Sequence, residues 1–423
     1  MERYKEYKDS GVQWIGEIPS HWKQIKMKYC FKERSEKNHP NEPVLCATQS
    51  QGVIPQSMYA NRVVVVNKGF EGLKLVKEGD FVISLRSFEG GIEYAYYQGI
   101  ISAAYTVLEP NNPKESNYWK YLFKSQPYIQ LLQTCVTGIR EGQNINYPLL
   151  GRKMIPVPPL DEQKKIVSYI ESKTSKIDEY ISEKEKEVQL LNELKEAEIA
   201  KVVTQGLNPN VKMKDRGISW IGMIPEHWEV KRVASLFTGK VNTNSDFAYQ
   251  HAFKFYYGTL VPKDEVGDAE EYRETYVKYQ VLRKDDILIN GLNLNYDFVS
   301  QRVAIAPSDG IITSAYIVAR PRKGTNADYY NYLFKAMDSK KLFHGMGTGI
   351  RLTLSFDELK KHIVVYPPVD EQQAIVAYIN EKTAKVESLI TDLQAEIEHL
   401  KEYKQRLIAD CVTGQVNVQN INI

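Results

Sequence analysis

The sequence has few cysteines and no long apolar run. Its 423 residues include four cysteines, and none of them belongs to a Cys-x-x-Cys pair. This spacing argues against a disulfide framework and a zinc ribbon, and it favours a reducing cytosol. No apolar run approaches the roughly 20 residues that a membrane-spanning helix needs, and no apolar signal segment follows the N-terminus. We therefore expect a cytoplasmic protein.

Motifs of catalysis and metal binding are also missing. The sequence has no P-loop, no His-Glu-x-x-His and no Gly-x-Ser-x-Gly, and its seven histidines form no metal-spaced pair. Tyr366-Pro-Pro-Val369 and Val157-Pro-Pro-Leu160 faintly resemble the Asn/Asp-Pro-Pro-aromatic motif of amino-methyltransferases, but they lack its leading Asn or Asp. Glu-x-Lys triplets such as Glu162-Gln-Lys164 are expected by chance in a Lys- and Glu-rich helix. We predict a chain without a catalytic residue, a metal ligand or a cofactor of its own.

Charge is unevenly distributed along the chain. The net charge is +2, but residues 161–205 carry −3 and residues 370–414 carry −4, so the rest of the chain carries +9. Two mildly basic parts thus alternate with two acidic, helix-like parts. A modest positive excess permits a polyanionic partner without proving one.

The sequence repeats itself at an offset of 206 to 211 residues, with all matches in the same order. The repeated segments are Gly11–Trp22 with Gly217–Trp228, Val76–Ile83 with Leu282–Ile289, Tyr118–Lys124 with Tyr329–Lys335, Thr137–Arg140 with Thr348–Arg351, and Pro158–Gln163 with Pro367–Gln372. One ancestral unit of about 210 residues has been duplicated. His21 and His227 recur between Pro and Trp, which favours a structural role for both.

Each copy predicts a mixed α+β head. Short β-like runs at Arg62–Val66, Asp80–Ile83 and Val303–Ile305 alternate with Gly- and Asn-rich turns. One helix is expected over Tyr118–Leu132 and its counterpart over Tyr329–Phe343. The predicted domains are a first head over 1–157, a long helix over 158–206, a second head over 207–366, a long helix over 367–415 and a tail over 416–423.

Each copy ends in one long amphipathic helix. Two prolines block an earlier start, and Asp161 and Asp370 suit the N-cap. Apolar residues recur every seven positions in the second helix, at Ile379, Val386, Leu393, Leu400 and Leu407. The first helix has a similar stripe that Lys184 interrupts. The pattern predicts an antiparallel coiled coil of the two helices with an approximate two-fold axis. The alternative is two separate helices, each packed on its own head.

Two related heads on one chain suit the recognition of two short, separate segments of a long regular polymer. On duplex DNA, elements one helical turn apart lie on the same face, about 34 Å from centre to centre. The Trp-Ile-Gly-x-Ile-Pro-x-His-Trp segment, Thr-Gly-Ile-Arg and Pro-Pro-x-x-Glu-Gln, each present twice, resemble the specificity subunits of type I restriction–modification systems. The resemblance covers nearly the whole chain in the right order.

The resemblance implies a non-catalytic, sequence-specific binder of double-stranded DNA. Each head would read one half of a bipartite site, and the helices would set the spacer. It also implies two adenine-N6 methyltransferase subunits docked on the helices, joined by motor–nuclease restriction subunits. S-adenosylmethionine, ATP and magnesium would then belong to those partners.

Candidate DNA-binding residues are polar, cationic or aromatic side chains on loops of the heads, because base edges are read mainly by such groups. In the first head they are Arg86, Phe88, Glu89, Arg140, Gln143, Asn144, Gln49 and Gln51. In the second head they are Asn290, Asn293, Asn295, Tyr296 and Arg351. Any of these can equally be an ordinary surface residue.

Partner docking is assigned to apolar positions of the long helices. These positions are Ile177, Ile181, Val188, Val386, Leu393 and Leu400. The charged outer faces, such as Glu183–Glu187, are either solvated or bind partner helices. Two rival hypotheses remain: a stand-alone scaffold whose heads bind protein or RNA, and a single-chain restriction–methylation enzyme, for which the repeat leaves no room.

Overall fold

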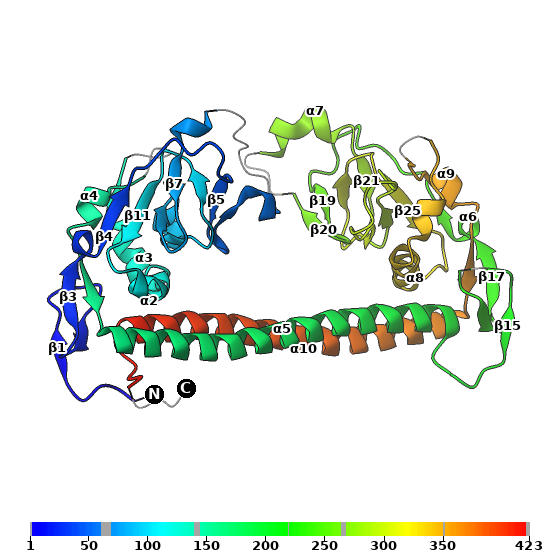
Figure 1. Cartoon of the computed structure of the whole chain (residues 1–423). Helices are drawn as coiled ribbons and strands as arrows, with labels where there is room; N and C mark the ends of the chain where they lie inside the picture. The colour runs from blue at the N-terminus through cyan, green and yellow to red at the C-terminus, as the bar shows by residue number, and fades with distance from the viewer. Residues whose placement is uncertain are drawn as a thin grey trace. The chain divides into compact units, whose positions relative to one another are not determined.

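A computed structural model of the chain describes residues 2–60, 69–138, 144–218, 220–263, 268–349 and 352–419. The chain divides into two compact units, Met1–Glu185 with Gln394–Ile423 and Lys186–Leu393. Each unit contains one head and one half of each long helix (Figure 1). The division into five domains stays a prediction.

The first head contains a four-stranded antiparallel sheet in the order β4-β11-β8-β9 and five two-stranded sheets. Its strands are β1 Tyr7–Asp9, β2 Glu17–Pro19, β3 Lys23–Lys26, β4 Phe31–Arg34, β5 Leu45–Thr48, β6 Gly52–Pro55, β7 Lys74–Val76, β8 Phe81–Ile83, β9 Glu93–Tyr94, β10 Gly99–Ile101, β11 Thr106–Pro110, β12 Val136–Thr137, β13 Asn144–Ile145 and β14 Met154–Val157. Its helices are α1 Ser87–Gly90, α2 Ser116–Leu122, α3 Gln126–Gln133 and α4 Tyr147–Leu150.

The second head repeats this plan around the sheet β18-β25-β22-β23. Its strands are β15 Met213–Asp215, β16 Met223–Pro225, β17 Glu229–Arg232, β18 Phe237–Thr238, β19 Phe253–Tyr256, β20 Thr259–Pro262, β21 Gln280–Leu282, β22 Ile287–Ile289, β23 Val303–Ile305, β24 Gly310–Ile312, β25 Ile317–Pro321 and β26 Ile363–Tyr366. Its helices are α6 Val233–Leu236, α7 Arg273–Tyr276, α8 Ala327–Ser339 and α9 Phe356–Leu359. The pairings β5-β6, β7-β10 and β3-β14 recur as β19-β20, β21-β24 and β17-β26, so the duplication and the α+β class are confirmed.

The central sheet of each head is covered on both faces. In the first head Phe81 and Ile83 of β8 belong to the large core with the helices, whereas Val82 belongs to a smaller core with β5, β6, β7 and β10. Alternation along the strand sends neighbouring side chains to opposite faces. In the second head Ile287 and Leu288 divide in the same way.

The helix expected over Tyr118–Leu132 is two helices, α2 and α3. Pro127 lies in the first turn of α3, where its missing N–H and its ring interrupt a helix that arrives from α2. The second head lacks this proline, and α8 is continuous over 13 residues. The expected strand Arg62–Val66 lies outside the described residues.

The long helices are α5, Leu160–Gln205, and α10, Val369–Val412. The N-cap prediction was wrong by register: both helices begin one residue before Asp161 and Asp370, and the carbonyl of Pro159 accepts the N–H groups of Glu162 and Gln163. Both aspartates lie instead in the first turn, where negative charge favours the helix dipole.

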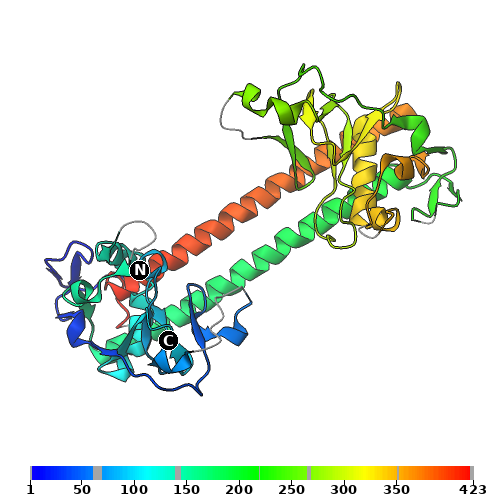
Figure 2. The same ribbon diagram turned by 90° about the horizontal axis from the view of Figure 1, so that it is seen from above.

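The long helices run antiparallel in each unit (Figures 1 and 2). In the first unit Lys404 Nζ lies 2.6 Å from Asp178 Oδ1, and Tyr180 donates to Glu396 at 3.2 Å. Lys184 occupies its seam position as a half-buried side chain, 3.5 Å from Glu396.

The second unit continues the same antiparallel register. Tyr378 donates to Glu198 at 2.8 Å, and Lys195 lies 3.5 Å from Glu387. The antiparallel prediction is confirmed in both units, and the alternative of two separate helices is excluded.

A carboxylate in the first turn of each long helix joins the helix to its head. Glu162 accepts from Trp22 Nε1 at 2.9 Å, lies 2.7 Å from His21 Nε2 and accepts from the hydroxyl of Tyr4. Gln419 of the C-terminal segment adds a hydrogen bond at 3.3 Å. Burial raises the pKa of Glu162, but these four hydrogen bonds outweigh it and hold the pKa below its usual value.

The second copy repeats this carboxylate clamp with fewer partners. Glu371 lies 2.6 Å from His227 Nε2 and accepts from Trp228 Nε1 at 2.9 Å. The His-Trp and Pro-Pro-x-x-Glu-Gln motifs therefore recur together because their side chains meet. The predicted structural role of His21 and His227 agrees with these contacts.

We expect Glu162→Gln to lower the free energy of unfolding by about 1–3 kcal/mol, because the amide keeps one acceptor oxygen in place of two and loses the negative charge that its four donors stabilise. The folded-state pKa is lowered, so the contribution is present above the unfolded pKa and disappears as pH falls through the folded pKa. Urea unfolding at neutral and acidic pH measures this. Asp161→Asn, at an exposed neighbour, should stay within about 0.5 kcal/mol of the parent. Equal effects of the two variants would contradict the clamp.

Candidate nucleic-acid interface

In the first head, the three segments with predicted DNA-binding residues converge around α1. The chain leaves β8 through Ser84, whose N–H donates to Ser87 Oγ at 2.8 Å, and then forms α1. A Cβ at Gly90 would lie 2.9 Å from Gln49 Cδ, so the β5–β6 turn packs directly on α1. The β13 strand, which begins at Asn144, also contacts α1.

The structure places most predicted residues of this head on the surface. Arg86, Glu89 and Asn144 are exposed, as are the two glutamines of the β5–β6 turn, Gln49 and Gln51. Phe88 is half-buried and packs against the core, where it anchors α1 to the head. Arg140 and Gln143 lie outside the described residues.

A groove of about 540 Å³ joins two of these segments. Gln49 and Ser50 line one side, and Ser84, Leu85 and Arg86 line the other. Polar side chains on both walls and the cationic Arg86 on one of them suit base edges and phosphates. The groove therefore brings together two patches that the sequence predicts separately.

Sequence reasoning missed the acidic group that lines this groove. Glu93 of β9 is buried, with Oε1 2.6 Å from Lys124 Nζ and Oε2 without a hydrogen-bond partner among the described residues. Burial raises its pKa to about 7, although Lys124 opposes the shift. The signal available in the sequence was a charge in the otherwise apolar strand run Gly91–Ala95.

In the second head, the equivalent loop is longer and has different chemistry. Tyr296 is 77% exposed, and Asn293 is exposed in the left-handed region at φ 51°. Asn290 is half-buried and accepts from Leu292 N at 3.2 Å, and Asn295 is half-buried. The loop therefore presents Asn293 and Tyr296 more openly than the other two predicted residues.

A second segment of this head packs beside the loop. Leu354 N donates to Gly291 O at 2.9 Å, and Leu294 N donates to Leu352 O at 3.2 Å. Arg351 itself lies outside the described residues. Leu352 and Leu354, which follow it in the chain, lie against the 290–297 loop.

Aromatic side chains were also missed in the second head. The β19–β20 turn carries the exposed Tyr256 and Tyr257, where the first head has Gln-Ser-Gln. The exposed Phe298 stacks on His344, with ring centroids 4.6 Å apart. Exposed aromatic rings offer surfaces on which bases or sugars pack.

Within the described ranges, no group of three or more His, Cys, Asp or Glu side chains has metal-binding geometry. No helix in those ranges is long and apolar enough to cross a membrane.

Comparison with known families decides what the two heads have in common. A family model described as the type I restriction modification DNA specificity domain matches residues 20–190 and again 225–399. The chain belongs to this family. It carries two specificity domains, and its role is DNA sequence recognition.

Several specificity subunits resemble the chain over most of its length. The type I restriction enzyme MjaVIII specificity subunit of Methanocaldococcus jannaschii is 26% identical over 377 residues, 82% of this chain and 81% of that protein. The EcoBI specificity subunit of Escherichia coli is 21% identical over 406 residues, 81% of each protein. A chain from a solved structure on complex assembly and conformational transition of the type I R-M system has a TM-score of 0.66 at 16% identity, covering 94% of this chain and 99% of that one, and shows the same fold.

The predicted partner-docking residues of α5 and α10 lie in the seam between the two helices. Ile181 is buried, and the others are half-buried: Ile177, Val188, Val386, Leu393 and Leu400. The more exposed apolar side chains are Leu190, Leu194 and Leu389, at 63%, 62% and 53%.

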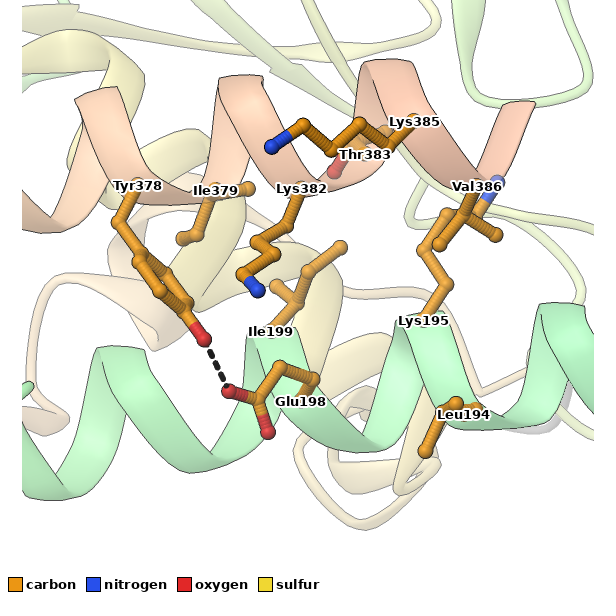
Figure 3. A pocket seen from close by; sticks show the side chains of 10 residues that line it. All are labelled: Leu194, Lys195, Glu198, Ile199, Tyr378, Ile379, Lys382, Thr383, Lys385 and Val386. Atoms are coloured by element: carbon orange, nitrogen blue, oxygen red, sulfur yellow. Dashed lines mark hydrogen bonds between the residues drawn. The ribbon is translucent and has the colours of Figure 1, made fainter. Parts of the chain in front are cut away.

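A hollow of about 420 Å³ lies between α5 and α10 in the second unit (Figure 3). Leu194, Ile199, Ile379 and Val386 line it together with the methylene stems of lysines. The Tyr378–Glu198 hydrogen bond closes one end. The helices thus leave apolar surface accessible beside the seam.

We expect the stability of the first head to depend on the titration of Glu93. Because the folded-state pKa is about 7 against an ordinary 4.5, the folded protein binds this proton more tightly. The free energy of unfolding therefore decreases as pH rises from 4.5 to about 7. Urea unfolding of the parent and of Glu93→Gln across this range isolates the effect. The variant should lose part of the decrease, and identical slopes would refute the assignment.

Proposed function

We propose that this specificity subunit reads a bipartite site on double-stranded DNA, one half with each head. The observation that carries the proposal is a duplicated scaffold with divergent loops. At the end of the equivalent strands β8 and β22, one head presents Arg86 and Glu89, and the other presents Asn293 and Tyr296. Different hydrogen-bonding groups at one structural position select different bases.

We further propose that α5 and α10 set the spacer between the half-sites. Both are continuous helices, of 46 and 44 residues, and each unit holds them in antiparallel register. A long paired helix is stiffer than a loop and so suits a fixed separation.

The catalytic steps belong, in this proposal, to other subunits. Two adenine-N6 methyltransferase subunits dock on the helices, and restriction subunits join them. S-adenosylmethionine, ATP and magnesium bind those partners. The exposed leucines of α5 and α10 support a docking role, since contiguous apolar surface on a helix marks an interaction site. The four buried free cysteines agree with a cytosolic complex.

Exchange of residues 1–157 for the same region of another type I specificity subunit should transfer one half-site and leave the other intact. Modification-sensitive sequencing of DNA from cells that carry the hybrid and its methyltransferase measures the marked motif. The reciprocal exchange of 207–366 is the matched control. A hybrid that changes both half-sites at once would count against independent heads.

Seven residues inserted into α5 between Lys184 and Glu193, with seven in the facing part of α10, should lengthen the spacer. The insertion preserves the heptad phase and adds about 10 Å, or roughly three base pairs. The half-sites themselves should not change. An unaltered spacer in the sequenced motif would show that the helices do not measure it.

A stand-alone scaffold would bind no methyltransferase, whereas the proposed specificity subunit binds two. Leu190→Glu with Leu389→Glu should reduce co-purification of the methyltransferase by about tenfold or more, since buried charge opposes docking. Glu183→Gln, on the exposed charged face, is the matched control. Two-to-one recovery of the methyltransferase with the parent chain supports the proposal, and its absence would favour a stand-alone scaffold.

A further inference from the structure

A buried cation holds the recognition loop of the second head. The side chain of Arg302 is 1% exposed. Its Nη1 donates to the carbonyls of Asn290 at 3.1 Å and Leu292 at 2.8 Å, and its Nη2 donates to the carbonyl of Asp297 at 2.7 Å. All three carbonyls belong to the loop that presents Asn293. The planar guanidinium fork therefore fixes the direction of three peptide groups at once.

Two carboxylates support this arginine. Asp338 of α8 accepts from the backbone N of Arg302 at 2.6 Å, and Asp297 Oδ2 lies 3.6 Å from Nη2. Asp297 also accepts from the backbone N of Ser300 at 2.9 Å and of Val299 at 3.1 Å. The loop is therefore tied to the buried Arg302 and Asp338, and the partly exposed Asp297 adds bonds within it.

The first head holds its loops with a different cation. Lys124, in the turn between α2 and α3, donates from Nζ to the carbonyls of Gln49 at 3.2 Å and Gly90 at 2.9 Å. Its third contact is Glu93 Oε1 at 2.6 Å. One ammonium group thus joins the β5–β6 turn to α1, the two walls of the groove, and a buried carboxylate neutralises it.

The two cations do not occupy equivalent positions. At the offset of 211, the pairs are Gly91 with Arg302, Glu93 with Ala304, and Lys124 with Lys335. A Cβ at Gly91 would lie 2.3 Å from the carbonyl of Phe123, so the first head has no room for an arginine there. Lys335 lines a different hollow, beside Lys195 and Glu387 of the long helices. The two heads therefore hold their recognition loops with cations at different positions of the fold.

We propose that Lys124 and Arg302 are head-specific positioning residues that determine half-site specificity without contacting DNA. The inference rests on the proposed reading of one half-site by each head. A positioned loop discriminates bases because hydrogen bonds to base edges need correct direction as well as correct chemistry. Transfer of a recognition loop between such heads then requires transfer of its own cation.

The test uses Arg302→Met and Lys124→Met, each expressed with the methyltransferase partner, and reads the marked motif by modification-sensitive sequencing. Arg302→Met should lower discrimination in the half-site of the second head by about tenfold, the factor for loss of roughly one base contact. The other half-site should keep its sequence. Lys124→Met should lower discrimination in the half-site of the first head and leave that of the second head unchanged. Lys323→Met, at an exposed lysine of the second head, is the control and should change neither half-site.

Arg302→Lys and Lys124→Arg separate positioning from folding. Each retains a cation and should restore part of the lost discrimination, while thermal unfolding shows that the Met variants remain folded. Half-sites that relax together, or folded Met variants with unchanged half-sites, would overturn the assignment. A parent system that marks no bipartite motif would overturn the proposed function itself, and this result is distinct from both.

Discussion

One carboxylate at the start of each long helix joins the helix to the segment that leads into its head. Glu162 and Glu371 stand in the first turn of α5 and α10 and accept the indole N–H of Trp22 and Trp228. In the first copy Tyr4 and Gln419 add bonds from both ends of the chain. The clamp explains why two motifs far apart in sequence recur as a pair.

The two heads share their central sheets and differ in the loops that we propose contact DNA. The central sheets pair strand for strand, and the cores on their two faces correspond. The loops after β8 and β22 differ in length, in side chains and in the cation that holds them. A conserved scaffold with independent loops allows one half-site to change while the other stays constant. In the proposed function, two specificity domains in one chain thereby read an asymmetric target.

Much of this architecture could be predicted from the sequence. The duplication, the α+β heads and the antiparallel helices follow from repeats and heptads, which are strong periodic signals. The break between α2 and α3 was missed although Pro127 marks it, because the apolar pattern continues through the turn. The N-cap of α5 was misplaced by two residues, since Pro159 and not Asp161 precedes the first helical residue and accepts the first helical N–H groups.

The candidate site was less predictable for a physical reason. Loop residues such as Gln49 and Arg86 are recognisable by type, but their meeting in one groove depends on long-range packing. Lys124 and Glu93 act through contacts between residues 31 to 75 positions apart, and Arg302 bonds carbonyls 5 to 12 positions before it, which no sequence motif encodes. The docking residues were placed in the helix seam because a heptad marks burial, whereas exposed leucines lie beside it.

The claim that two heads read two half-sites is tested most directly by the methylated motif in DNA from cells that carry the parent system. Modification-sensitive sequencing should show two different short sequences separated by a constant number of unspecified base pairs. A single continuous motif, or two half-sites at variable separation, would contradict the account.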